Sequence, residues 1–139
     1  MKRLKEIMTR DVRTIEPTAR LKDAARLMDE LSIGMMPVSE NGRIIGTITD
    51  RDIVINCVAK GGDVNNLTVR HAMSEGVETA HEDDSVDDAA RLMGDKQIRR
   101  LIVLNSRKEL AGVVAMADLA THVRASDTVH KAIGGVSEG

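Results

Sequence analysis

The spacing of hydrophobic and polar residues predicts two helices in the first half of the chain, one near the start of that half and one near its end. The first helix is expected to open at Pro17-Thr18, with Thr18 as its N-cap. Its apolar residues follow the i, i+3, i+4, i+7 spacing of a helix with one buried face: Leu21, Ala24, Ala25, Met28 and Leu31. The second helix is predicted over residues 50–58, and Gly61 and Gly62 end it.

Strands are predicted around the first helix. Residues 11–15 alternate between polar and apolar, residues 35–39 form a short apolar run, and residues 44–49 read as a strand that returns beside it. Asn41-Gly42 lies between the last two segments and is a hairpin-turn signal, because both residues tolerate positive φ. The first half therefore predicts a β-α-β-β-α order.

The second half repeats this order. The sequence Ala-Ala-Arg-Leu-Met of residues 24–28 recurs at residues 89–93, and the same spacing pairs Thr14 with Thr79. Strands are predicted at residues 77–80, 101–105 and 110–115, and helices at residues 85–96, 116–124 and, as a single turn, 129–133. Asp83 is expected to cap the first of these helices. A period this long is typical of a duplicated supersecondary unit.

This duplication predicts a mixed α+β fold made of two β-α-β-β-α repeats. The first repeat is expected to span residues 1–62 and the second residues 69–125. Residues 63–68 are polar and are predicted to be the linker, and residues 126–139 a C-terminal tail.

Composition narrows the class of protein. The chain has 139 residues, and its net charge of −2 argues against a nucleic-acid or membrane-surface partner. No apolar run approaches the roughly 20 residues of a membrane span. The single cysteine, Cys57, cannot form an internal disulfide, which favours a reducing, cytoplasmic location. The chain has no Phe, Tyr or Trp, so its core must be aliphatic and methionine-rich.

The most informative local segment runs from Gly46 to Asp52, where a strand is predicted to turn into a helix. Glycine allows a ligand to approach the backbone closely. Thr49 and Asp52 stand at the start of the helix, where a hydroxyl could donate to a phosphate and a carboxylate could accept from sugar hydroxyls. The same two residues are also close to a capping box, which requires no ligand. The residues alone leave both interpretations open.

Together, the repeat and this junction resemble a known family. The doubled Ala-Ala-Arg-Leu-Met helix, the Met36-Pro37-Val38 strand and the Gly46-x-x-Thr49-x-x-Asp52 junction look like a tandem pair of cystathionine β-synthase (CBS) domains, also called a Bateman module. The resemblance covers residues from about Ile7 to Arg124. It implies halves packed about a pseudo-twofold axis, with clefts for adenosine-containing ligands such as AMP, ADP, ATP or S-adenosylmethionine. It also implies that modules commonly pair into dimers.

The resemblance assigns a first ligand-binding site. Asp52 would hold the ribose hydroxyls, and Thr49 would contact ribose or phosphate. Thr14 would lie near the base or sugar, and Arg51 could reach a phosphate, although a solvated arginine is an equal alternative. The adenine slot would be lined by the polarizable and apolar residues of the central strand: Met35, Met36, Pro37 and Val38. For Met36, simple core packing is the competing interpretation.

A second site is implied in the other half, with differences. Its residues would be Thr79, Arg99, Arg100, Leu101 and Asp118. Ala115 stands where the first half has Thr49, which removes a hydroxyl and is expected to remove the helix cap. Arg99 and Arg100 could compensate by contacting phosphate, or could be a solvated surface pair. The two sites are therefore expected to be unequal.

Other chemistry is not indicated. The four histidines show no metal-ligand spacing, and Cys57 lies in an apolar run, as expected for a buried small side chain. No catalytic constellation is visible, so the chain is expected to be a regulatory nucleotide sensor acting on a separate partner, and not an enzyme. The alternative is a ligand-independent dimeric scaffold. A homodimer is expected because helical faces next to both junctions are apolar: Ile53, Val54 and Cys57, with Leu119, Ala120 and Val123.

Overall fold

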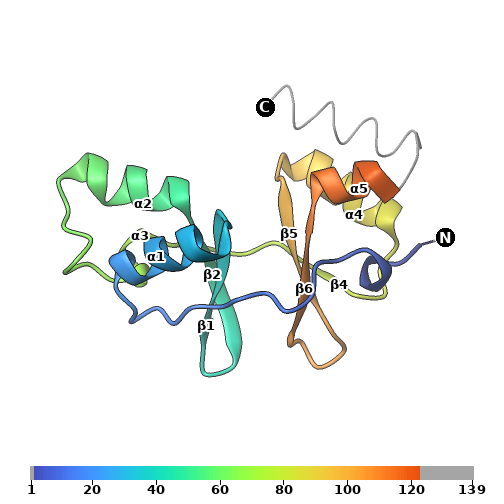
Figure 1. Cartoon of the computed structure of the whole chain (residues 1–139). Coiled ribbons are helices and arrows are strands. Elements are labelled where there is room, and N and C mark those ends of the chain that lie inside the picture. Colours follow the sequence, from blue (N-terminus) through green and yellow to red (C-terminus); the bar gives the residue numbers. More distant parts are fainter. Residues whose placement is uncertain (1, 123–139) are drawn as a thin grey trace. The chain divides into compact units, whose positions relative to one another are not determined.

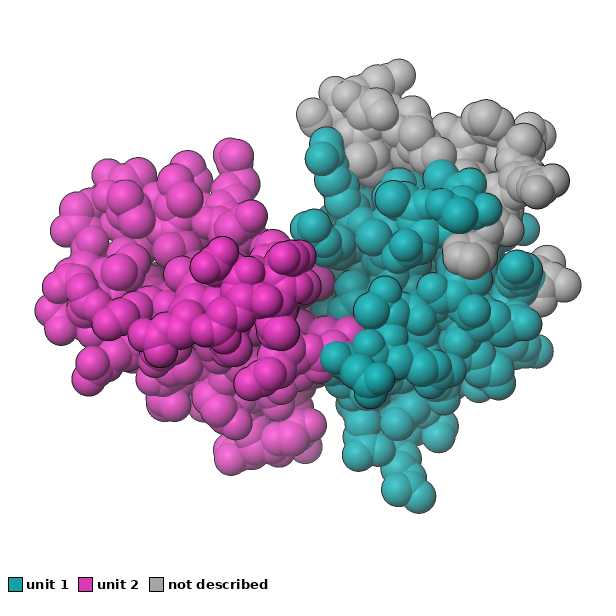
Figure 2. Space-filling model, viewed as in Figure 1, with its two compact units in different colours: residues 1–11, 78–139 teal, residues 12–77 magenta. Residues whose placement is uncertain are grey.

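The chain folds into two compact units (Figures 1 and 2). The structure is a computed structural model and describes residues 2–122. Unit 2 consists of residues 12–77, and unit 1 combines residues 1–11 with residues 78–139. The predicted repeats, residues 1–62 and 69–125, do not coincide with these units. The difference arises because residues 1–11 pack with the second repeat, and residues 69–77 pack with the first.

Unit 2 contains helices α1 (Leu21–Leu31), α2 (Asp50–Asn56) and α3 (Val69–Ala72), with a 3₁₀ turn at Val58–Lys60. Its antiparallel sheet has the order β1 (Met35–Glu40), β2 (Arg43–Thr49) and β3 (Ser74–Glu75). One core cluster joins the helices to the sheet, through Ile15, Leu21, Ala24, Met28, Met36, Val38, Ile48, Ile53, Cys57, Val69 and Ala72. The core is aliphatic and methionine-containing, as the absence of aromatic residues requires.

Unit 1 repeats this arrangement of helices and a three-stranded sheet, but a different strand completes its sheet. It contains a 3₁₀ turn at Leu4–Glu6, helices α4 (Val86–Lys96) and α5 (Met116–His122), and strands β4 (Thr79–His81), β5 (Arg100–Leu104) and β6 (Leu110–Ala115). Strand β4 runs parallel to β5, and β6 pairs with β5 antiparallel. The equivalent of β4 in unit 2 is reduced to a bridge between Ile15 and Val38, so the strand predicted at residues 11–15 does not form there.

The helix starts differ from the predicted N-caps. Helix α1 begins after Arg20, without a side-chain cap, and not at Thr18. Its first amides are satisfied from elsewhere in the unit, since Leu21 N donates to the carbonyl of Leu67 at 2.9 Å. Helix α4 is capped by Ser85, whose hydroxyl accepts from the Asp88 amide, and not by Asp83.

The predicted turn between β1 and β2 is confirmed, whereas the second helix ends at Asn56, two residues earlier than predicted. Asn41 and Gly42 form the β1–β2 turn with φ of 53° and 79°. The 3₁₀ turn after α2 ends at Gly61, which has the left-handed conformation with φ 76°. Both long helices end on equivalent left-handed residues, Ser32 and Gln97, each with φ 54°. The helical turn predicted at residues 129–133 and the tail at 134–139 lie outside the described residues.

A close backbone crossing explains one glycine of each repeat. A Cβ atom on Gly46 would lie 2.3 Å from the Ser74 carbonyl oxygen, and one on Gly112 would lie 2.6 Å from the Thr9 carbonyl oxygen. In unit 2, the segment that passes close to the glycine is β3, which pairs with β2. In unit 1, it is the segment at Thr9, which forms a bridge with Val113 of β6. These glycines therefore have a structural role that does not depend on any ligand.

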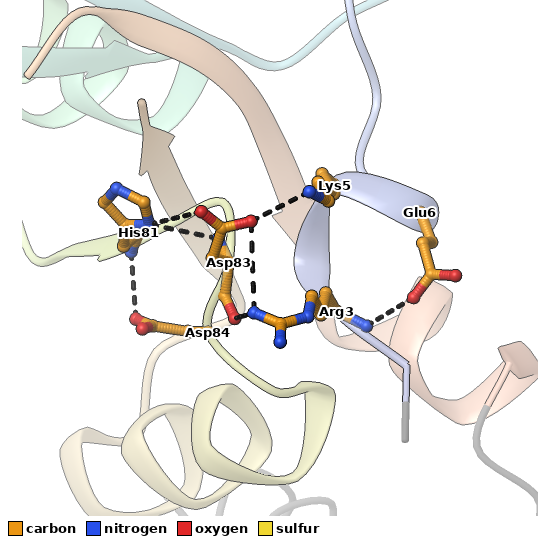
Figure 3. Close-up of polar contacts among 6 residues, drawn as sticks. All are labelled: Arg3, Lys5, Glu6, His81, Asp83 and Asp84. Atoms are coloured by element: carbon orange, nitrogen blue, oxygen red, sulfur yellow. Dashed lines mark hydrogen bonds and ion pairs between the residues drawn. The ribbon is translucent and has the colours of Figure 1, made fainter. Parts of the chain in front are cut away.

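The first residues of the chain complete unit 1. Leu4 is fully buried in the unit 1 core, and its amide donates to the Asp84 carbonyl at 3.0 Å. Figure 3 shows the surrounding polar contacts: the Lys5 ammonium lies 2.9 Å from Asp83 Oδ1, and the Arg3 guanidinium donates to the Asp83 carbonyl. The N-terminal segment is therefore part of the unit formed mainly by the second repeat.

Residues 63–77 complete unit 2 in the same way. Val64 and Leu67, from the segment predicted as a linker, pack against the unit 2 core. Helix α3 and strand β3 follow before the chain passes to unit 1. Within the described part of the chain, no helix is both long and apolar enough to cross a lipid bilayer.

Candidate functional site

The strand-to-helix junction of unit 2 brings the main candidates of the first site together. Met35 begins β1 and pairs with Thr49, the last residue of β2. The amide of Asp50 donates to the Gly34 carbonyl at 3.1 Å. The start of β1 and the start of α2 are thus hydrogen-bonded neighbours, although they are distant in sequence.

Thr49 and Asp52 form the capping box that the sequence left as an alternative. The Asp52 amide donates to Thr49 Oγ1, and the Thr49 amide donates to Asp52 Oδ2, each at 3.0 Å. The other oxygen, Asp52 Oδ1, accepts a long hydrogen bond of 3.4 Å from the Ser74 hydroxyl. A carboxylate has about four acceptor positions, so these bonds orient Asp52 and leave capacity for a ligand hydroxyl.

The junction of unit 1 has the same geometry with fewer cap bonds. Arg100 begins β5 and pairs with Ala115, and the Met116 amide donates to the Arg99 carbonyl at 2.8 Å. The Ala115 amide donates to Asp118 Oδ2 at 3.1 Å. The expectation that alanine removes the cap is therefore only half right, because the hydroxyl bond is missing while the carboxylate bond remains.

The second oxygen distinguishes the two carboxylates. Within residues 2–122, Asp118 Oδ1 accepts no hydrogen bond, whereas Asp52 Oδ1 accepts from Ser74. The residue equivalent to Ser74 in unit 1 is Thr9, at the matching bridge to β6. Both aspartates are half-buried.

The strand residues predicted for the first site divide into two groups. Met36 and Val38 are fully buried in the unit 2 core, so their side chains are core residues, as the alternative interpretation of Met36 held. Pro37 is buried, and its carbonyl accepts from the Ile15 amide at 3.1 Å. Thr14, next to Ile15, and Met35 are half-buried and remain accessible.

The residues predicted for the second site also divide. Leu101 is buried in the unit 1 core, so its side chain offers no ligand surface. Thr79 begins β4, is exposed, and pairs with Ile102. Arg99 and Arg100 are exposed and make no ion pair with any residue that the structure describes. Arg51, in the first site, is exposed and unpaired within the same range.

Two side chains at these junctions were not predicted. Asp50 places its Oδ2 atom 3.2 Å from the point where a Cβ of Gly34 would stand, and its Oδ1 accepts from the Arg51 amide at 2.8 Å. Ser74 reaches Asp52 from β3. Ser74 is absent from the sequence pattern because β3 is only two residues long.

Charge effects and metal chemistry point to no other site in the described residues. The pKa of Asp83 is held below its usual value by the hydrogen bond from Lys5, against a smaller opposing effect of burial. Asp83 lies in the N-terminal cluster of Figure 3 and not at either junction. In the range 2–122, no three His, Cys, Asp or Glu side chains are grouped so that they could hold a metal ion.

Known proteins share this sequence and architecture. The chain is 34% identical over 137 residues to the CBS domain-containing protein YhcV of Bacillus subtilis, covering 99% of this chain and 96% of that protein. It is 32% identical over 120 residues to Hypoxic response protein 1 of Mycobacterium tuberculosis, covering 86% of this chain and 83% of that protein.

Solved structures agree with these relatives. Hypoxic Response Protein I, solved with two coordinated zinc ions, matches with a TM-score of 0.78 and 31% identity over 88% of this chain and 99% of that one. The CBS domain pair of MJ0100, solved in complex with 5′-methylthioadenosine and S-adenosyl-L-methionine, matches with a TM-score of 0.76 and 26% identity over 87% of this chain and 94% of that one.

The family model adds the position of both repeats. The model described as "CBS domain" matches residues 4–58 and again residues 69–133. These two matches cover most of the chain and agree with the duplicated mixed α+β fold, in which each unit holds a three-stranded sheet. The chain therefore belongs to the CBS domain family.

Proposed function

We propose that this protein is a regulatory module that binds an adenosine-containing ligand and modulates a separate partner protein, without catalysing a reaction. The ligand class is AMP, ADP, ATP or S-adenosylmethionine. One observation carries the proposal: each unit holds a half-buried carboxylate, Asp52 or Asp118, in a fixed orientation at a strand-to-helix junction. The ligands in the MJ0100 structure support the adenosine class.

The proposed contacts follow from this geometry. Asp52 and Asp118 accept from ribose hydroxyls, since the backbone amides of Thr49 and Ala115 hold each carboxylate in place. Thr14, Thr79 and the half-buried Met35 supply further contacts beside the strands. For Met36, Pro37, Val38 and Leu101, only the backbone remains available, because their side chains are buried.

We also propose a cytoplasmic homodimer. Ile53, Cys57 and Leu119 are buried within their own units, so they do not contribute to an exposed face. Val54, Ile55 and Val58, by contrast, are exposed large hydrophobic residues on α2 and the following turn. Exposed apolar patches of this kind often mark an interface. Ala120 is exposed on α5, and Val123 lies outside the described residues.

The second candidate is a dimeric scaffold that needs no ligand. A specific observation favours it: the capping box accounts for Thr49 and Asp52, and the backbone crossing accounts for Gly46. All three motif residues of unit 2 thus have structural roles of their own.

Calorimetric titration separates the two candidates. Purified protein is titrated with AMP, ATP, S-adenosylmethionine and NADH, with GMP as a control that shares ribose and phosphate but not adenine. Saturable heat at micromolar concentration for an adenosine ligand, without comparable heat for GMP, supports the sensor. No heat from any ligand, together with a dimer mass by light scattering, supports the scaffold.

A further inference from the structure

The first segment of the chain packs on unit 1 in the way that a bound peptide would. We call residues 2–11 the N-terminal arm. The arm belongs to unit 1, although the whole of unit 2, residues 12–77, separates it in sequence from the rest of unit 1. The covalent connection between the arm and its binding surface therefore runs through all of unit 2, and the contacts with that surface are non-covalent.

Three apolar side chains anchor the arm. Leu4, Ile7 and Met8 are buried in the core cluster of unit 1. The other members of this cluster come from α4, β5, β6 and α5. Without an arm, these core residues would face water, which is unfavourable for an apolar surface. Unit 1 therefore requires an arm from some copy of the chain.

Backbone hydrogen bonds fix the arm at both ends. Arg3 forms an antiparallel bridge with Ser85, and the residues that flank this pair are joined by two amide–carbonyl bonds of 3.0 Å. Further along the arm, Thr9 and Val113 of β6 exchange both of their backbone bonds, at 2.9 and 3.0 Å. Addition of an extended segment to a sheet edge is a common mode of peptide recognition.

The charges of the arm and of its binding surface are complementary. The Lys5 ammonium lies 2.9 Å from Asp83 Oδ1, and the Arg3 guanidinium donates to the Asp83 carbonyl, also at 2.9 Å (Figure 3). The turn at residues 81–84 carries three carboxylates, whereas the arm is formally positive. Complementary charges of this kind fix the register in which a segment docks.

A short connection without regular structure joins the arm to unit 2. Residues 10–14 form no helix or strand, and their side chains are exposed or half-buried. Asp11 has a φ of 56°, a left-handed conformation that is uncommon for residues other than glycine. Rotation about this connection would release the arm without breaking a helix or strand, and it would relieve the backbone of Asp11.

From these contacts we propose that unit 1 accepts the N-terminal arm of a second copy of the chain in place of its own. Two chains then exchange their arms, and each contact of the arm is formed again between the copies. Exchange of an identical element is a low-cost route to a dimer. The closed form predominates in dilute protein, because the tether keeps the arm near its own unit 1. Higher protein concentration favours exchange.

This inference goes beyond the proposed function and rests on no part of the adenosine assignment. It also uses a different surface from the exposed apolar residues Val54, Ile55 and Val58. An exchanged dimer and a dimer formed through those residues can therefore be distinguished by where the two copies are joined.

A disulfide trap tests the exchange directly. Arg3 and Ser85 are a non-hydrogen-bonded antiparallel pair, whose Cα atoms lie about 4.5 Å apart, within the range of a disulfide. Chains carrying Arg3→Cys and chains carrying Ser85→Cys are mixed in urea, refolded together at increasing protein concentration and oxidised. The native Cys57 is buried and does not compete. We expect a covalent dimer of one chain of each kind, in a yield that rises with concentration.

Two controls define the specificity of the trap. Ser106→Cys makes the same substitution at an exposed turn of unit 1, and mixed with Arg3→Cys it should give only adventitious cross-linking. The double variant Arg3→Cys/Ser85→Cys should close a disulfide within one chain in dilute protein, which verifies the geometry of the pair. Circular dichroism checks that each variant is folded.

Charge reversal gives a second test that leaves the Ser85 cap intact. Lys5→Glu and Asp83→Lys each place like charges at the arm contact of a closed chain. When the two variants are refolded together, both contacts of an exchanged dimer are complementary. Native mass spectrometry with one isotope-labelled chain should show the mixed dimer enriched about 2- to 10-fold over the statistical proportion. The double variant Lys5→Glu/Asp83→Lys, refolded with labelled wild type, should show no enrichment.

The outcomes are decisive for the arm. A covalent Arg3→Cys and Ser85→Cys dimer above the Ser106→Cys level supports exchange. Closure within the double variant, without that dimer at any concentration, overturns it, even if light scattering shows a dimer held elsewhere. If the double variant does not close, the charge-reversal mixture decides, and a statistical proportion of mixed dimer overturns the proposal. None of these results changes the adenosine assignment, which the ligand titration tests separately.

Discussion

Replacing Gly46 by alanine tests the backbone crossing that shapes each junction. The new Cβ would lie 2.3 Å from the Ser74 carbonyl oxygen, so β2 and β3 must move apart. Because only two residue pairs join these strands, the movement is expected to break their pairing. Overpacking costs about 1–3 kcal/mol, and each lost hydrogen bond about 1 kcal/mol.

An opposing effect reduces this cost. The φ of Gly46 is not positive, so alanine adopts its backbone without strain and restricts the unfolded chain, which stabilises the protein by about 0.4–1 kcal/mol. The expected net loss in the free energy of unfolding is about 1–3 kcal/mol. Gly42→Ala is the matched control for a different cause of destabilisation. A Cβ on Gly42 would meet nothing within 4 Å, so any loss of stability there comes from its positive φ of 79° and not from a steric clash.

Urea unfolding followed by far-ultraviolet circular dichroism is the appropriate assay, because the chain has no tryptophan or tyrosine for fluorescence. Asparagine tolerates positive φ, so Gly42→Asn should recover stability relative to Gly42→Ala, whereas Gly46→Asn should be no better than Gly46→Ala. A Gly46→Ala protein as stable as the wild type would refute the steric argument.

Three further predictions concern stability. Thr49→Ala removes one capping bond and should cost about 1 kcal/mol of unfolding free energy in urea; an unchanged midpoint would contradict the capping role. Leu4→Ala should cost about 2–5 kcal/mol, because Leu4 is fully buried in unit 1, and a loss below 1 kcal/mol would show that the N-terminal segment is not part of that core. Lys5→Ala should raise the pKa of Asp83 towards its ordinary value, measured by carboxyl NMR titration. Because the pKa of Asp83 is lowered in the folded protein, its ionised carboxylate stabilises the fold at pH values above about 4, the pKa of an aspartate in the unfolded chain. This stabilisation is lost as the pH falls through the pKa of the folded protein, so the variant should lose less stability in acid than the wild type. An unshifted titration would exclude Lys5 as the cause.

The fold was predictable where local sequence determines local structure. The spacing of Leu21, Ala24 and Met28 located α1, and Asn41-Gly42 located the β1–β2 turn. The N-cap at Thr18 was wrong because carbonyls of residues 64 and 67 satisfy the first amides of α1. That contact depends on tertiary packing, which no local propensity records.

Short elements held by distant segments were not predictable. Helix α3 and strand β3 contain four and two residues, too few for a periodic signal. Helix α3 forms because Val69 and Ala72 are buried in the unit 2 core, and β3 forms because it pairs with β2. The assignment of residues 1–11 to unit 1 has the same origin, since Leu4 is buried against elements of the second repeat.

The candidate sites were predictable from spacing, but their side-chain environment was not. Thr49 and Asp52 lie at a junction, as expected, and the structure adds that each hydrogen-bonds to the other. Residues 36–38 of β1 are all buried, which the alternation of a strand does not predict, whereas Met35 remains accessible. The position of Asp50 over Gly34 depends on the turn between β2 and α2, which the one-dimensional pattern does not specify.

The central claim is that the junction carboxylates hold the ribose of an adenosine ligand. The most direct measurement is a calorimetric cycle with AMP and 2′,3′-dideoxy-AMP on the wild type and on the folded variants Asp52→Ala, Asp118→Ala and the double variant. Loss of the hydroxyls should weaken binding to the wild type by about 10- to 100-fold, and the double variant should bind both nucleotides equally. An equal penalty for the dideoxy ligand in the wild type and the double variant, or no binding of AMP to the wild type, would contradict the account.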